Sequence, residues 1–273
     1  MSEIAQHIAV SGRVNIDDLD WAQARAVGLS EREVAWLSHF ADIESQTIHY
    51  FLELSKLPVA RDRELLTFLT MWNYEEYFHS HALTRIMEEC GVKALSASER
   101  AAEVRANARF KATYEDWAQQ AMAKLTPKSF LALWMTWGAI NECLVSQGYE
   151  AIAHNTKNPV LAEICRRIAK QERRHFAYYF NQAEARLASS TFTQRYVRFF
   201  VEKFFSPVGS GVKSDSEMAE FMNSMLPGEM LPKAMSYVDK RICTLPGFAG
   251  FRKLMEYGES IAPSAPAAVP RAA

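Results

Sequence analysis

The sequence predicts an all-α fold in which a four-helix bundle core carries additional peripheral helices. Three observations support this prediction. Apolar residues recur at helical spacing over long segments, strand-type alternation is nearly absent, and glycine is sparse, with 11 in 273 residues. Hydrophobic residues make up 49% of the chain, which is ample apolar material for one large core.

The first long helix is expected to follow a segment of mixed character, Met1–Leu29. It begins at Ser30, because Ser30 and Glu33 have the spacing of a capping box. It can continue to about Leu54, before Pro58 prevents further helix.

Four further helices are expected before residue 190, separated by glycine- and proline-containing turns. They cover about Asp62–Cys90, Ser98–Lys124, Ser129–His154 and Val160–Ser189. The segment Ser129–His154 is unusually apolar, as expected of a buried helix.

Shorter helical segments follow at Thr193–Phe205, Ser216–Met225 and Leu231–Cys243. The tail Ala262–Ala273 is rich in proline and alanine and is expected to be disordered. We therefore predict one helical domain over residues 1–260 and a disordered tail over 261–273. Within the domain, the bundle occupies about 30–190 and the C-terminal helices about 191–260.

Charge and cysteine content restrict the classes of function. The net charge of -1 provides no global basic field, so nucleic-acid binding is not expected. The longest strongly apolar run, Phe130–Ile140, is shorter than the roughly 20 residues that span a bilayer, so no transmembrane segment is predicted. No signal peptide is recognisable, and the cysteines form no C-x-x-C pair. A cytoplasmic protein with free thiols is therefore expected; the cysteines are Cys90, Cys143, Cys165 and Cys243.

Two Glu-x-x-His motifs lie within predicted helices. One joins Glu76 and His79, and the other joins Glu172 and His175. Residues three apart lie on one helix face, so both side chains of a motif can reach the same metal pair. A motif of this length is a weak signal by itself.

The spacing of two further glutamates strengthens the signal. Glu44 precedes Glu76 by 32 residues and Glu142 precedes Glu172 by 30, with an expected turn between the members of each pair. At a rise of about 1.5 Å per residue, each antiparallel hairpin brings its single Glu level with its motif. Two facing hairpins then place four Glu and two His at one depth, the di-metal carboxylate arrangement of helix bundles.

We therefore expect a two-metal site with six ligands: Glu44, Glu76, His79, Glu142, Glu172 and His175. Four ionised carboxylates balance two divalent ions, whereas an isolated buried carboxylate costs several kcal/mol. Ligation by oxygen and nitrogen without thiolate favours iron or manganese over structural zinc. Any one of these residues alone would more commonly be an ordinary solvated side chain. Competing glutamates are Glu53, Glu75 and Glu150.

The motifs and their surroundings resemble the ferritin-like di-iron carboxylate proteins, and among them the soluble acyl-ACP desaturases. Residues 72–79 (WNYEEYFH) carry the double Glu that precedes the ligand His in that family. Residues 161–175 (LAEICRRIAKQERRH) resemble its last metal-binding helix. The resemblance covers about residues 30–190 and implies a ferritin-like bundle that holds two iron ions, with manganese as an alternative at either position.

The resemblance also implies an activity. It is that of an oxygen-activating oxidoreductase with molecular oxygen as co-substrate, which desaturates or hydroxylates an acyl chain presented on an acyl carrier protein. A ferredoxin-like electron donor and a homodimer are expected. By resemblance, Glu44 and Glu142 are terminal ligands, Glu76 and Glu172 are bridging ligands, and each His completes one coordination sphere. No separate acid or base is assigned.

Two positions depart from the desaturase pattern. Val145 lies where a Thr is usual, one turn after Glu142, and Gln171 lies where an acidic residue is common. The reaction therefore stays open between desaturation, hydroxylation and N-oxygenation of a small molecule. Arylamine N-oxygenases carry a further His where this chain has Ile168. The alternative of another class is a ferritin-like metal-handling or peroxide-scavenging protein, which leaves the residues after Ser190 without a role.

Two further features have a structural and a functional interpretation. Aromatic and methionine residues near the ligands are candidates for an apolar tunnel, although core packing is the commoner role of such a stripe. They are Trp134, Met135, Trp137, Tyr149 and Tyr179. The basic and aromatic segment Arg195–Phe205 is a candidate docking surface, although core or dimer packing is commoner.

Overall fold

In the structure, a computed structural model, the long elements of the described residues are all α-helices, and this confirms the all-α prediction. It describes residues 3–55, 62–95, 99, 122–205 and 215–262, which contain no β-strand. Most of the helix expected at Ser98–Lys124, and nearly all of the tail Ala262–Ala273, lie outside these residues.

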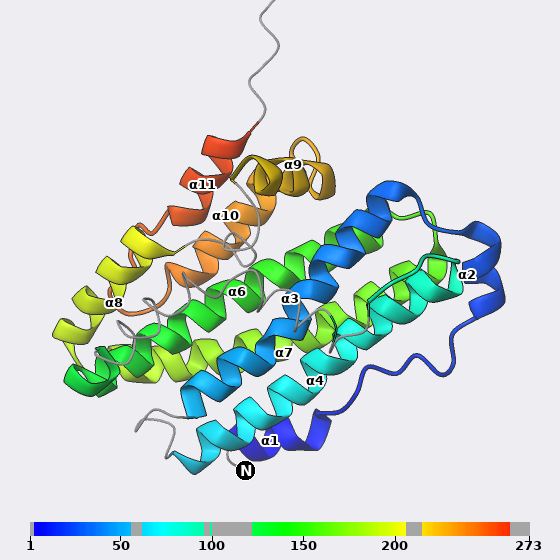
Figure 1. Cartoon of the computed structure of the whole chain (residues 1–273). Coiled ribbons are helices and arrows are strands. Elements are labelled where there is room, and N and C mark those ends of the chain that lie inside the picture. The colour runs from blue at the N-terminus through cyan, green and yellow to red at the C-terminus, as the bar shows by residue number, and fades with distance from the viewer. Residues whose placement is uncertain (1–2, 56–61, 96–98, 100–121, 206–214, 263–273) are drawn as a thin grey trace, which may run out of the picture.

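In the described part of the chain, four long helices lie side by side as two hairpins (Figure 1). They are α3 (Glu31–Ser55), α4 (Arg63–Glu89), α6 (Pro127–Asn155) and α7 (Pro159–Ala188). Helix α3 packs along α4, α6 packs along α7, and the two hairpins meet where α4 contacts α7. Each end lies within two residues of its predicted position, which is the usual uncertainty of a helix boundary.

The predicted capping box forms at the start of α3. The Ser30 backbone N–H donates to the Glu33 carboxylate at 2.7 Å, and the Glu33 N–H donates to Ser30 Oγ at 3.3 Å. The second oxygen of Glu33 accepts a hydrogen bond from Thr156 in the turn between α6 and α7. The two hairpins are therefore connected at this end of the bundle.

Asn158 begins α7 and also holds the N-terminal region. Its Oδ1 accepts from the backbone N–H groups of Val160 and Leu161, at 3.1 and 3.2 Å. Its Nδ2 donates to the carbonyl oxygens of Ala24 and Gly28, at 3.1 and 3.0 Å. Asn158 is 1% exposed and Ala24 is fully buried, so the hydrogen bond between them is shielded from water.

Among the described residues, six shorter helices cover the outside of the hairpins. They are α1 (Glu3–Val10), α2 (Trp21–Val27), α8 (Thr191–Phe204), α9 (Asp215–Met225), α10 (Met230–Ile242) and α11 (Lys253–Ile261). Helices α1 and α2 pack on α4, α8 and α10 pack on α6, α11 packs on α10, and α9 contacts both α3 and α6. The sequence did not predict α1, α2 or α11, because helices of 7 to 9 residues are too short for a clear apolar period.

One hydrophobic core connects these elements, with buried members from Ile4 in α1 to Leu254 in α11. Helices α6 and α7 approach closely at Gly138 of α6, where a Cβ atom would lie 2.6 Å from the Tyr179 ring of α7. All four cysteines are free. No helix in the described part of the chain is long and apolar enough to cross a membrane.

Replacing Asn158 by alanine should lower the free energy of unfolding by about 1–3 kcal/mol, because the cap is lost and the carbonyls of Ala24 and Gly28 lose their donor. Denaturant unfolding of the metal-free protein measures this change. Lys157→Ala, at the exposed neighbouring position, is the control and should stay within about 0.5 kcal/mol. Superimposable curves for wild type and N158A would contradict the prediction.

Candidate metal centre

The structure brings all six predicted ligands together between the four long helices. Helix α3 supplies Glu44, α4 supplies Glu76 and His79, α6 supplies Glu142, and α7 supplies Glu172 and His175. None of these residues is more than 7% exposed. Ionisable groups are rarely buried to this degree without charge compensation.

The candidate ligand atoms form two groups of four. One group is Glu44, Glu76, His79 and Glu172, and the other is Glu76, Glu142, Glu172 and His175. Within each group the atoms lie within 4.8 Å of one another. Because Glu76 and Glu172 belong to both groups, the geometry suits two neighbouring cations with two shared carboxylates.

Both imidazoles direct Nδ1 at the shared carboxylates. His79 Nδ1 lies 2.9 Å from Glu172 Oε1 and 3.1 Å from Glu76 Oε2. His175 Nδ1 lies 3.1 Å from Glu76 Oε1 and 3.3 Å from Glu172 Oε2. Nδ1 of His79 is therefore available to one of the two positions, and Nδ1 of His175 is available to the other.

One buried oxygen at the centre has no hydrogen-bond donor in the described part of the chain. It is Oε1 of Glu172, whose contact with His79 Nδ1 is close but not aligned as a hydrogen bond. A buried acceptor without a partner is costly. A cation would satisfy it, and the set of four carboxylates and two imidazoles balances two divalent ions, so the residues fit the expected metal pair.

Without cations the centre retains protons. Burial raises the pKa of Glu44 and Glu142 well above the ordinary carboxyl value, and nearby carboxylates raise it further. Burial alone would lower the pKa of His79, but the charges of Glu76 and Glu172 outweigh that effect and raise it to about 10. The pKa of His175 is also raised, because contacts with four carboxylates outweigh its burial. Divalent ions that bind here would replace these protons.

Each unshared glutamate is oriented by a donor from another helix. The Trp72 indole N–H of α4 donates to Glu142 Oε1 at 3.0 Å. The Tyr149 hydroxyl of α6 donates to Glu44 Oε1. The sequence suggested Tyr149 only as a tunnel or core residue and did not assign Trp72 to the site.

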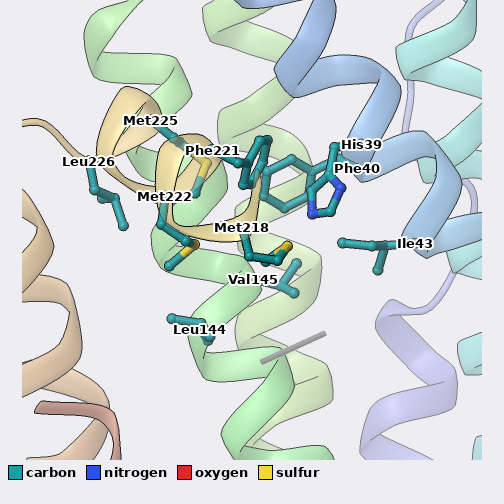
Figure 2. A pocket seen from close by; sticks show the side chains of 10 residues that line it. All are labelled: His39, Phe40, Ile43, Leu144, Val145, Met218, Phe221, Met222, Met225 and Leu226. Atoms are coloured by element: carbon teal, nitrogen blue, oxygen red, sulfur yellow. The ribbon is translucent and has the colours of Figure 1, made fainter. Parts of the chain in front are cut away.

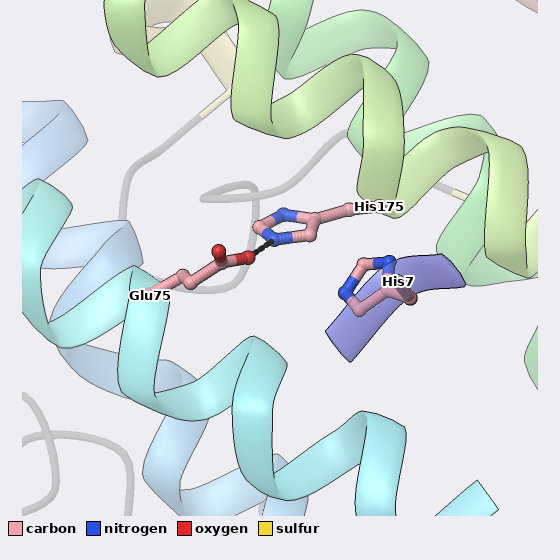
Figure 3. A group of neighbouring side chains, drawn as sticks. All are labelled: His7, Glu75 and His175. Atoms are coloured by element: carbon pink, nitrogen blue, oxygen red, sulfur yellow. Dashed lines mark hydrogen bonds and ion pairs between the residues drawn. The ribbon is translucent and has the colours of Figure 1, made fainter. Parts of the chain in front are cut away.

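The outer nitrogen of each His is held by the residue that precedes the Glu of the opposite motif. Figure 3 shows the bond between His175 Nε2 and Glu75 Oε2, which is 2.7 Å long. On the other side, His79 Nε2 lies 2.7 Å from Gln171 Oε1. The sequence treated Glu75 as a competitor and Gln171 as a departure, and the structure places both against the site.

The segment after α1 closes over these two residues. Ser11 Oγ and the Gly12 N–H donate to Glu75 Oε1 at 2.9 and 2.8 Å. The Gly12 carbonyl accepts from Gln171 Nε2 at 2.9 Å. No motif in the sequence identifies Ser11 or Gly12, because this contact depends on how the N-terminal segment folds back.

His7 of α1 lies beside the Glu75–His175 pair, with its ring centroid 6.1 Å from that of His175 (Figure 3). These three residues form a third group of candidate ligand atoms. However, the Glu75–His175 hydrogen bond already occupies the facing atoms. Burial lowers the pKa of His7 to about 4, so it is neutral at pH 7.

The other candidates do not join the centre. Glu150 is about half exposed and pairs with Arg173, and the side chain of Glu53 lies outside the described structure. Among the tunnel candidates, Met135 and Tyr179 are fully buried core residues. Trp134 and Trp137 pack against the same core.

Anaerobic loading with Fe(II) should give two ions per chain in the wild type, one in Glu44→Gln and none in Glu172→Gln. The difference arises because Glu44 belongs to one group and Glu172 to both. Elemental analysis after desalting measures the content, and circular dichroism should show unchanged helicity. Glu150→Gln is the matched surface control. Two ions bound by E172Q would contradict the shared position of Glu172.

Metal affinity should increase with pH between about pH 6 and about pH 9, because bound ions must displace protons from groups whose pKa is raised. Lower pH favours the protonated, metal-free centre, and higher pH removes that competition. Chelator competition at several pH values measures the trend, and calorimetry in buffers of different ionisation enthalpy counts the released protons. An affinity independent of pH would contradict the protonation of the empty centre.

Comparisons of the chain with protein-family models, with curated proteins and with solved structures found no match. The centre is therefore defined by its geometry. Its main features are two buried groups of Glu and His that share Glu76 and Glu172, and that could hold metal ions.

Proposed function

We propose that this protein is a ferritin-like, oxygen-activating di-iron oxidoreductase that acts on an apolar organic substrate. The observation that carries the proposal is the pair of buried ligand groups with Glu76 and Glu172 in common. Iron, with manganese as the alternative, suits this set of oxygen and nitrogen donors. When bound, the reduced metal pair supplies the chemistry that activates molecular oxygen.

The chain's own residues would bind the ions and shield them from water. Glu44 and His79 would bind one ion, and Glu142 and His175 would bind the other. The two shared glutamates would bind both ions. The Tyr149 and Trp72 donors keep the unshared carboxylates in place. Burial of all six ligands excludes bulk water from the reacting position.

An apolar pocket lies next to the two helices that supply the unshared glutamates (Figure 2). It is enclosed by side chains of α3, α6 and α9. Ile43 directly precedes Glu44, and Val145 lies three residues beyond Glu142, so the pocket begins within about one helical turn of both. An apolar substrate could therefore approach the metal pair from this side, opposite the residues that hold the histidines.

The pocket is narrow, with a cavity volume of about 30 Å³. An acyl chain would have to displace side chains to enter. Helix α9 contributes Met218, Met222 and Met225 to the lining, and methionine side chains adapt readily because they are unbranched and flexible. We therefore favour desaturation or hydroxylation of an acyl chain, with oxygenation of a smaller molecule as the alternative.

The proposal also includes an external electron donor of ferredoxin type, a carrier-bound substrate and a homodimer. Helix α8 offers a surface for one of these partners, because Phe192, Phe199 and Phe204 are each more than half exposed. Basic residues accompany them, including Arg195 and Lys203. N-oxygenation with an additional His ligand is not favoured, since Ile168 is a buried core residue.

Oxygen uptake tests the proposed chemistry. The iron-loaded, reduced protein, freed of excess reductant, should consume oxygen faster than the same amount of free Fe(II), and E172Q should not exceed free Fe(II). E150Q should behave as the wild type. An oxygen electrode and optical spectroscopy measure the reaction. Native protein that contains zinc or no metal, or uptake no faster than free iron, would overturn the proposal.

Filling the pocket should reduce turnover without removing metal. Met222→Trp should lower kcat/KM for a long-chain acyl thioester by about tenfold or more, since even small steric changes in an apolar pocket cost this much. Glu220→Gln, on the exposed side of α9, is the control. Product analysis by mass spectrometry and iron content measure the two effects. Unchanged turnover in M222W would remove the pocket from the substrate path.

A further inference from the structure

The two histidines of the centre have unequal outer partners. His175 Nε2 bonds to Glu75, a carboxylate, and His79 Nε2 bonds to Gln171, a neutral amide. Both bonds are 2.7 Å long, so the difference between them is charge rather than distance. Each partner directly precedes the Glu of the other motif, and the arrangement is therefore reciprocal.

The hydrogen-bond network fixes the orientation of both imidazoles. Gln171 Nε2 donates to the Gly12 carbonyl, so Gln171 Oε1 must face His79 and accept from its Nε2–H. An ionised Glu75 has no proton to donate, so in that form it accepts from the Nε2–H of His175. In both residues Nδ1 is thereby left to face the candidate metal position.

The charge of Glu75 is well supported. Its Oε1 accepts from Ser11 Oγ, the Gly12 N–H and Arg174 Nη2, the last at 3.1 Å. Hydrogen bonds to the ionised form stabilise a carboxylate. A carboxylate that accepts from the outer N–H of a ligand His makes the inner nitrogen a stronger donor to metal. A neutral amide orients its His but strengthens the inner nitrogen as a metal ligand less, because charged hydrogen bonds are roughly twice as strong as neutral ones.

The unshared carboxylates of the two positions have matching hydrogen bonds. Glu44 receives one hydrogen bond from Tyr149, and Glu142 receives one from Trp72. The other two carboxylates are shared. Among the direct hydrogen bonds to the six ligands, the partners of the histidines are therefore the main difference between the two positions.

We propose that the two metal positions differ in affinity, that the His175 position binds its ion first and more tightly, and that Glu75 and Gln171 act as the positioning residues that set this order. The inference rests on the proposed metal centre. Loss of an outer partner of a metal-bound His commonly changes metal affinity by about 10- to 100-fold, and we expect a difference of this size between the two positions.

Anaerobic titration of the metal-free protein with Co(II), under chelator competition, tests the order of binding. The wild type should bind in two steps separated by about 10- to 100-fold. Glu44→Gln keeps the His175 position, so its Co(II) affinity should equal that of the tight step. Glu142→Gln keeps the His79 position, so its Co(II) affinity should equal that of the weak step. Two steps within twofold of each other, or the reverse assignment, would overturn the inference.

Matched truncations identify the cause of the difference. Glu75→Ala in the E44Q background should weaken Co(II) binding by about 10- to 100-fold. Gln171→Ala in the E142Q background should weaken it by less. The double variant E75A/Q171A, with intact ligands, should bind two Co(II) with nearly equal affinity. A difference that persists in the double variant would place its origin elsewhere.

Further measurements keep the test decisive. Circular dichroism and thermal unfolding check that each variant is folded, and Glu75→Gln replaces E75A if truncation prevents folding; E75Q should also weaken the tight step. A wild type that binds no Co(II) would reject the metal centre itself. Two ions bound with equal affinity would reject only the order of binding. Two ions bound with unequal affinity, in a protein whose iron-loaded form consumes no oxygen, would reject the oxidoreductase function and support the order of binding.

Discussion

The burial of four carboxylates and two imidazoles at one level of the bundle is the constraint on which the rest of the structure depends. Each buried charge costs several kcal/mol unless it is compensated. Hydrogen-bond donors from neighbouring helices offset part of this cost, but Glu172 Oε1 has no donor in the described structure. Such an arrangement is stable only where cations or protons balance its charge. Where protons do so, the pKa values of the protonated groups are raised.

Long helices are suited to this constraint. Their backbone groups are satisfied within each helix, so the side chains between them are free to serve the centre. Residues i and i+3 share a face, which lets Glu76 act with His79 and Glu172 with His175. The two hairpins then bring the motifs face to face, because α4 contacts α7.

The outer network connects the centre to parts of the chain that carry no ligand. Gly12 touches both Glu75 and Gln171 through its peptide groups. Asn158 ties the carbonyls at the end of α2 to the start of α7, the helix of the second motif. The N-terminal segment therefore shapes the surroundings of the candidate metal positions, although its sequence shows no motif. On the opposite side, α9 covers α3 and α6 and encloses the apolar pocket.

The sequence alone determined the four long helices and the six residues that meet between them. This was possible because helical periodicity, capping residues and the i, i+3 spacing are local properties, and because equal hairpin lengths set equal depths. Only the tertiary structure decided which side chains support those six. The Tyr149–Glu44 and Gln171–Gly12 bonds join residues 105 and 159 positions apart, and no local pattern encodes such contacts. Glu75 shows the difference most clearly: its place beside Glu76 was visible in the sequence, but its bond to His175 exists only because α4 and α7 pack together.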